Sequence, residues 1–150
     1  MSDFVKADHV FLGNTAATAD EVLEFLAKQA VELGVATDEA AVLAALRARE
    51  AQGTTGMQGG FAIPHCKSDA VNASTVLVMK FAQDVEWSSM DGQPIRAAIS
   101  LLVPEGEAGT TFLKLLSQVA MLLMNVEFRD KMMATDDPEA IAALINEGLN

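Results

Sequence analysis

Basic residues, cysteines and long apolar runs are all scarce in this chain, and each scarcity argues against a class of protein. Ten lysines and arginines stand against 21 aspartates and glutamates, so the net charge is −11. A protein that binds nucleic acid needs the opposite balance, because its surface must attract phosphates. Acidity favours attraction to a basic surface on a partner protein instead. We therefore expect no nucleic acid among the partners.

The rarity of cysteine and of continuous apolar sequence bears on location. Cys66 is the only cysteine, so no internal disulfide can form, which fits a reducing cytoplasm. No apolar run reaches the roughly 18 to 20 residues that cross a bilayer. The first ten residues, MSDFVKADHV, lack the basic and apolar regions of a secretory signal. The sequence thus predicts a cytoplasmic protein without direct membrane insertion.

Helix and strand signals fill the 150 residues without a repeat or a linker, which predicts one domain over 1–150. Thr18 and Glu21 form a capping box before an apolar pattern of helical spacing, and Gly34 is a natural end. The other predicted elements are a helix over 37–53 with Thr37 as its N-cap, strands over 74–82 and 95–104, a buried helix over 112–124, and a helix from Asp137 and Pro138 to Gly148. This order predicts an α/β (α+β) fold, with a small mixed β-sheet flanked by helices.

One of the two histidines, His65, follows a proline in the segment GGFAIPHCKS at 59–68. Pro64 restricts the backbone there, and the glycines allow a close approach of another group. One interpretation is a structural histidine that caps a strand end. The other is a nucleophilic imidazole that attacks phosphorus and carries the phosphoryl group. Such a site needs cations or backbone N–H groups, and the candidate cations are Arg47, Arg49 and Lys67.

Two further chemistries fit the same segment less well. A metal site needs three or four ligands, and His9 and Cys66 have no recognised spacing with His65. A hydrolase with Cys66 as nucleophile and His65 as base is a second alternative. Adjacent side chains on an extended segment point to opposite faces, however, so these two groups would not face one another. We expect no metal and no cofactor.

Three segments in order resemble one known family over nearly the whole chain. The stretch ALRAREAQGTTGMQGGFAIPHCKS at 45–68 combines an arginine–glutamate pair, a T-G turn and an apolar-A-apolar-P-H run. The pieces VEWSSMDGQPIRAAISLLVPEGE at 85–107 and FLKLLSQVAMLL at 112–123 follow it. Together they are similar to enzyme IIA of the fructose/mannitol class in the bacterial sugar phosphotransferase system. That resemblance implies a mixed sheet flanked by helices.

The resemblance also implies a role for individual residues. His65 would accept a phosphoryl group from the histidine phosphocarrier protein and pass it to a cysteine of an enzyme IIB, a phosphotransferase step in sugar uptake. Arg49 would stabilise the phosphoryl group, whereas Arg47 is interpreted as a solvated helix charge and Cys66 as a small packing residue. We expect Phe61 and Phe112 to form the apolar centre of the contact with partner proteins.

The chain departs from the family at Phe112, where many members carry a second histidine. A phenyl ring cannot donate a hydrogen bond to the phosphoryl group. The hydroxyls of Thr110 or Thr111 would replace that donor, or would serve only as N-caps. The departure keeps an alternative open, in which the chain is a regulatory module of the nitrogen-regulatory type. The sequence identifies neither the sugar nor the oligomeric state.

Overall fold

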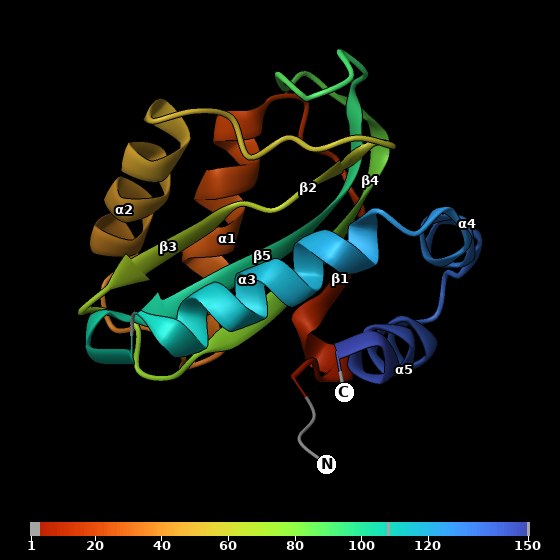
Figure 1. The fold of residues 1–150 in the computed structure, drawn as a ribbon. Coiled ribbons are helices and arrows are strands. Elements are labelled where there is room, and N and C mark those ends of the chain that lie inside the picture. The colour runs from red at the N-terminus through yellow and green to blue at the C-terminus, as the bar shows by residue number, and fades with distance from the viewer. Residues whose placement is uncertain (1–3, 108, 150) are drawn as a thin grey trace.

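The computed structural model describes residues 4–107 and 109–149, without the side chains of Thr110 and Thr111, and its centre is a mixed β-sheet (Figure 1). The long strands β4 (Thr75–Val85) and β5 (Ile95–Pro104) pair in antiparallel fashion. β1 (Val10–Asn14) runs parallel to β4. On the other side, β2 (Phe61–Ala62) and β3 (His65–Ser68) both run parallel to β5. The predicted mixed sheet is confirmed.

Helices cover both faces of this sheet. The two that precede the long strands, α1 (Ala19–Glu32) and α2 (Glu39–Ala51), lie together on one face. The three that follow lie on the other face: α3 (Thr110–Leu123), α4 (Val126–Ala134) and α5 (Pro138–Leu149). Figure 1 shows α3 crossing in front of β5, with α1 behind the sheet. The predicted class, α/β with helices flanking a small sheet, is confirmed.

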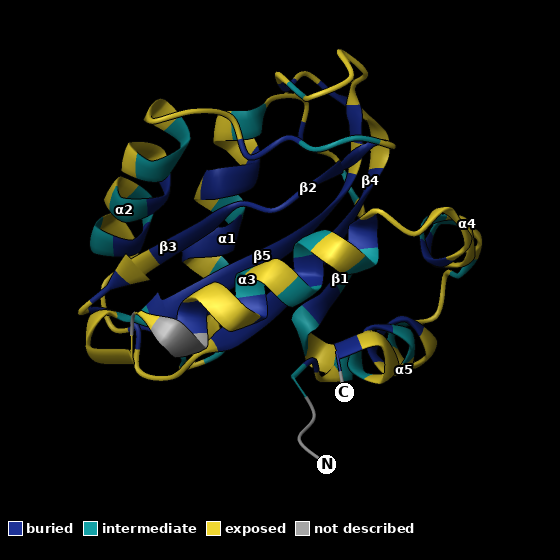
Figure 2. Cartoon of the chain, in the orientation of Figure 1, coloured by how far each residue is buried: buried dark blue, intermediate teal, exposed yellow. Residues whose placement is uncertain are grey.

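The apolar residues form two cores, one on each face of the sheet. Successive side chains of a strand point to opposite faces. Thus Leu77 and Met79 of β4 pack under α1 and α2, whereas Val76 and Val78 pack under α3 and α5. Figure 2 shows β5 as almost continuously buried, and residues 75–81 of β4 are buried as well. Burying such a side chain contributes roughly 1.5–3 kcal/mol, so helices hold both faces firmly.

The helix starts agree with the predicted caps at two of three positions. The Thr18 hydroxyl accepts from the Glu21 backbone N–H at 3.3 Å, and the Asp137 carboxylate accepts from Ala140 N–H at 3.3 Å. The prediction of Thr37 as an N-cap was wrong. Asp38 caps α2 by accepting from the Ala41 N–H at 3.1 Å. A carboxylate at a helix start also benefits from the helix dipole, which a hydroxyl does not.

Some elements were not predicted, and the burial of another was predicted wrongly. The sequence does not predict β1, β3 or α4, all of which are short. It also predicts that the helix over 112–124 is buried all round. In the structure α3 covers only one face of the sheet, and Leu113 and Met121 on its outer side are 61% and 68% exposed. Within the described part of the chain, no helix combines the length and the apolar character needed to cross a membrane.

Candidate functional site

Glycines and a proline shape the chain that leads into His65. Gly59 and Gly60 both have positive φ angles, 72° and 84°. At Gly59 a Cβ atom would also collide with the guanidinium end of Arg129, so a side chain there would strain the backbone and displace Arg129. The turn places β2 and β3 end to end beside β5, with Pro64 between them, and His65 becomes the first residue of β3. The imidazole is therefore fixed by a sheet and not carried on a free loop.

Hydrogen bonds to both ring nitrogens define the state of His65. Nδ1 lies 2.7 Å from the backbone oxygen of Ile63 and donates its proton to that carbonyl. Nε2 accepts from the Nε–H group of Arg49 at 3.1 Å. Because a carbonyl cannot donate and a guanidinium cannot accept, the proton is assigned to Nδ1 and the lone pair to Nε2. The ring presents one nucleophilic nitrogen.

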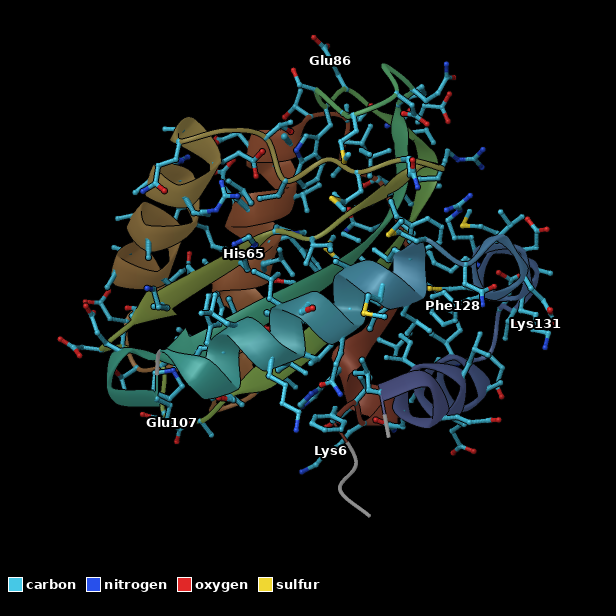
Figure 3. The ribbon with its side chains drawn as sticks, in the orientation of Figure 1. Lys6, His65, Glu86, Glu107, Phe128 and Lys131 are labelled. Atoms are coloured by element: carbon cyan, nitrogen blue, oxygen red, sulfur yellow. The ribbon has the colours of Figure 1, made fainter. Side chains whose placement is uncertain are left out.

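The surroundings of His65 keep its ring neutral. The side chain lies between α2 and α3, and only 8% of the residue is exposed (Figure 3). Burial lowers the pKa of the imidazole, and the charges of Arg49 and Lys67 lower the pKa further. The hydrogen bond to Ile63 and the Glu50 carboxylate act in the opposite direction. The pKa stays below the ordinary histidine value of about 6.5, so the nucleophilic lone pair is available at neutral pH.

A pocket of about 400 Å³ opens beside the imidazole. Its lining residues come from α2, β3 and α3: Ala45, Ala48, Arg49, Gln52, His65, Cys66, Lys67 and Phe112. Two cations thus face one cavity in a chain whose net charge is −11. A water molecule occupies about 30 Å³ in the liquid, so the pocket has room for a phosphoryl group and for a side chain that approaches it.

Arg49 and Lys67 differ from several other cations in the protein. Arg47 forms a two-pronged ion pair with Asp20 of α1, at 2.8 Å for each contact, and so points away from the pocket. Arg49 instead donates to the Gly53 carbonyl at 2.7 Å while it contacts His65. Within the described residues, neither Arg49 nor Lys67 has a carboxylate in ion-pair range. Both charges remain available to an anion.

Phe112 lies where the resemblance placed it, beside the imidazole. The two ring centroids are 5.8 Å apart and the rings are tilted by 46°. The Lys67 ammonium lies 5.7 Å from the centroid of the same phenyl ring, close enough for a cation–π interaction. Phe112 therefore covers the imidazole and helps to place the Lys67 charge, but it donates no hydrogen bond.

The expectation for Phe61 was wrong. Its side chain is completely buried, in the core between the sheet and the helices α3 to α5, so it cannot form a contact with a partner protein. Its apolar character and its place before the histidine are equally consistent with a core strand, which is what the structure shows. The side chains of Thr110 and Thr111 lie outside the described residues.

Cys66 lines the pocket but takes no part in its chemistry. Its side chain joins the core between the sheet and the helices α1 and α2. Burial raises the pKa of this thiol to about 12, so it carries no thiolate at neutral pH. No cluster of three or more histidines, cysteines or carboxylates suited to a metal ion occurs in the described part of the chain. The chemistry of the pocket is that of a neutral imidazole beside two cations.

The arginine–glutamate pair of the sequence predicts no role for its glutamate. Glu50 accepts hydrogen bonds from the Thr55 N–H and hydroxyl and from the Trp87 indole, at 2.8, 2.6 and 3.1 Å. The only feature of the sequence that pointed to a role for Glu50 in the site was its position next to Arg49. Its partners lie five and 37 positions away and could not be read from a pattern.

This chain matches one protein family over nearly its whole length. The model of the phosphoenolpyruvate-dependent sugar phosphotransferase system EIIA 2 family matches residues 3–148. The chain belongs to this EIIA 2 family. It is 31% identical over 147 residues to the fructose-specific EIIA component of Haloferax volcanii, across 98% of this chain and 95% of that protein.

Solved structures of EIIA proteins share the fold. The crystal structure of nitrogen regulatory protein IIA-Ntr from Neisseria meningitidis matches with a TM-score of 0.86 and 26% identity, over 95% of this chain and 96% of that one. Enzyme IIAMTL, in its complex with phosphorylated enzyme IIBMTL from Escherichia coli, matches with a TM-score of 0.75 over 94% and 96% of the two chains. At 20% identity the second match shows the fold alone.

Proposed function

We propose that this EIIA domain is a cytoplasmic phosphocarrier. It accepts a phosphoryl group on Nε2 of His65 from the histidine phosphocarrier protein and passes it to a cysteine of an enzyme IIB. The observation that carries the proposal is the hydrogen bonding of the imidazole. Nε2 holds the lone pair, faces the Arg49 guanidinium at 3.1 Å, and borders a pocket that also contains Lys67.

The acceptance step follows from this geometry. The Nε2 lone pair attacks phosphorus, and the nitrogen–phosphorus bond of the donor phosphohistidine breaks, so that the donor ring leaves with the electron pair. Positive charge develops on the His65 ring, and the Ile63 carbonyl stabilises it through the Nδ1–H bond. The guanidinium of Arg49 leaves Nε2 and binds the phosphoryl oxygens, and the Lys67 ammonium offers a second charge.

In the delivery step the phosphoryl group leaves His65, and the imidazole ring loses its positive charge. A thiolate of enzyme IIB attacks phosphorus, the bond to Nε2 breaks, and the imidazole recovers its lone pair. The complex of enzyme IIAMTL with phosphorylated enzyme IIBMTL supports such a partner for this fold. The acceptor in this proposal is the partner's cysteine, because the thiol of Cys66 is buried and protonated.

Intact mass spectrometry tests the proposal directly. The protein is incubated with phosphoenolpyruvate, enzyme I and the histidine phosphocarrier protein. We expect one phosphoryl group that is labile in acid and stable in base, as a phosphoramidate is. His65→Ala should abolish the mass shift, whereas the control His9→Ala should retain it. Labelling that persists in His65→Ala would overturn the proposal.

A regulatory role is the second candidate, and one comparison favours it. The match to IIA-Ntr of Neisseria meningitidis has a TM-score of 0.86. Phe112 also lies beside His65, at the position where the family resemblance implies a second histidine. In that role His65 still takes up the phosphoryl group, but the phosphorylated and unphosphorylated forms bind different targets. Mixing the labelled protein with an enzyme IIB separates the two candidates: rapid loss of label to a thiophosphate favours the carrier, and retention of label favours the regulator.

A further inference from the structure

Glu50 directly follows Arg49 at the end of α2, yet its carboxylate points to a different group of residues. It accepts from the Thr55 backbone N–H at 2.8 Å, from the Thr55 hydroxyl at 2.6 Å and from the Trp87 indole N–H at 3.1 Å. Thr55 and Trp87 are only 4% and 7% exposed. Hydrogen bonds to a charged acceptor are stronger than neutral ones, so this carboxylate holds the segment after α2 in one position.

A chain of backbone contacts leads from Thr55 to the imidazole. The Thr55 carbonyl accepts from the Ile63 N–H at 3.0 Å. The Ile63 carbonyl accepts from Nδ1 of His65 at 2.7 Å, and Nε2 accepts from Arg49. The contacts therefore form a closed ring, which starts at Glu50 and returns to its neighbour in α2. A displacement of Thr55 would be transmitted to the carbonyl that orients the imidazole.

Ser88 also restricts the 54–56 segment. The Thr54 hydroxyl donates to the Ser88 carbonyl, at 2.5 Å. A Cβ atom at Gly56 would lie only 2.1 Å from the same carbonyl oxygen, so this position admits glycine alone. Ser88 and the Glu50 carboxylate thus both hold this segment, in addition to its backbone contacts with β2 and Ile63. Loss of the carboxylate would remove the bonds that hold Thr55 to the end of α2.

We propose that Glu50 is a positioning residue, which acts through Thr55 and Ile63 to hold His65 in the Nδ1–H tautomer with Nε2 directed at the pocket. Which ring nitrogen carries the proton depends on the partner of the other nitrogen. Glu50 controls the place of that partner, the Ile63 carbonyl, although it does not touch the ring itself. The effect on phosphoryl transfer rests on the function proposed above, whereas the effect on the tautomer does not.

The test uses the unphosphorylated protein labelled with ¹⁵N. Long-range ¹H–¹⁵N correlation spectra distinguish the two imidazole tautomers of His65 at a pH above its pKa. We expect the wild-type protein to show the Nδ1–H form alone. Glu50→Ala should give a mixture of tautomers and a rate of His65 phosphorylation at least tenfold lower. Glu39→Gln, on the exposed first turn of the same helix, is the control and should change neither measurement.

Two milder variants keep the test decisive if Glu50→Ala fails to fold. Glu50→Gln keeps one acceptor oxygen, but its amide NH₂ group then faces one of the N–H or O–H donors of Thr55 and Trp87. Trp87→Phe removes only the indole N–H donor. Both should shift the tautomer ratio in the same direction by a smaller amount. A single Nδ1–H signal in every folded Glu50 variant would overturn the proposal. A wild-type protein that accepts no phosphoryl group would contradict the proposed function and leave the tautomer result standing.

Discussion

The two helices that flank His65 contribute to the site by different kinds of interaction. From α2, Arg49 donates to Nε2 and Glu50 holds the segment that contacts the ring. From α3, Phe112 contributes an aromatic face and no hydrogen bond. Hydrogen bonds depend steeply on distance and angle, whereas apolar packing is nearly non-directional. Substitutions on α2 should therefore change phosphoryl chemistry strongly, and substitutions on α3 should change it modestly.

Among substitutions that test this difference between α2 and α3, removal of the Arg49 guanidinium should lower the rate of His65 phosphorylation most. A hydrogen bond to a charged group contributes roughly 1.5–3 kcal/mol, which corresponds to about one to two orders of magnitude in rate. Arg49→Ala should therefore slow phosphorylation of His65 by about 10- to 100-fold in quenched-flow measurements, with an unchanged circular dichroism spectrum. Arg47→Ala, which loses only the ion pair with Asp20, should stay close to the wild-type rate. Equal effects of the two changes would contradict the geometry of the site.

A hydrogen-bond donor introduced on α3 should give this helix a contribution to phosphoryl transfer that is closer to that of α2. Imidazole is smaller than phenyl, so Phe112→His fits the space beside His65. One additional hydrogen bond to the phosphoryl group contributes about 1 kcal/mol, which corresponds to a rate increase of about fivefold. The rate of label uptake in the carrier assay measures it. Phe112→Ala, which opens space without supplying a donor, should show no increase, and an unchanged rate in a folded Phe112→His would mean that α3 needs no donor.

The pKa of His65 reports how both helices enclose the ring. Burial lowers this pKa, with a further contribution from the charges of Arg49 and Lys67. We expect the imidazole to titrate below about 6.5 in NMR spectra, and phosphoryl uptake to decline only below neutral pH. Phe112→Ala should raise the pKa by exposing the ring. A wild-type titration above the ordinary value would contradict the buried site.

The lowered pKa also makes stability depend on pH. Below about pH 6.5 the unfolded histidine binds a proton while the folded one does not, so the unfolded state holds more protons and the free energy of unfolding falls as the solution becomes more acidic. His65→Gln should weaken this dependence between pH 7 and 5, measured by urea denaturation of both proteins. If the free energy of unfolding changed equally with pH in the wild type and the variant, the pKa of the folded His65 would not be lowered.

The smallest expected effect concerns docking. With a net charge of −11, association with a phosphocarrier that has a basic docking surface should weaken as salt rises, because exposed charges are screened beyond about 10 Å at 0.1 M ionic strength. Isothermal titration calorimetry at two salt concentrations measures this change. An affinity that does not change with salt would assign the contact to apolar groups such as the exposed Leu113 of α3.

Much of the fold was predictable because its signals are local. Caps at Thr18 and Asp137 and the long β-branched runs of β4 and β5 depend on residues close in the chain. The parallel strand β1 was missed because its pairing partner β4 lies more than 60 positions away. In the same way, Phe61 was assigned to partner contact because its apolar character alone does not show burial, and only its place under α3 to α5 shows that it belongs to the core.

The sequence by itself determined that His65 follows a rigid proline, that Lys67 lies two positions after it, and that Phe112 stands where the family resemblance implies a histidine. These are properties of residue type and order. Only the tertiary structure decided which nitrogen of His65 holds the lone pair, that Arg47 pairs with Asp20, and that the Glu50 carboxylate binds Thr55 and Trp87. Each of these depends on an angle or a contact between segments that meet only when α2, β3 and α3 pack together, and no spacing in the sequence encodes it directly.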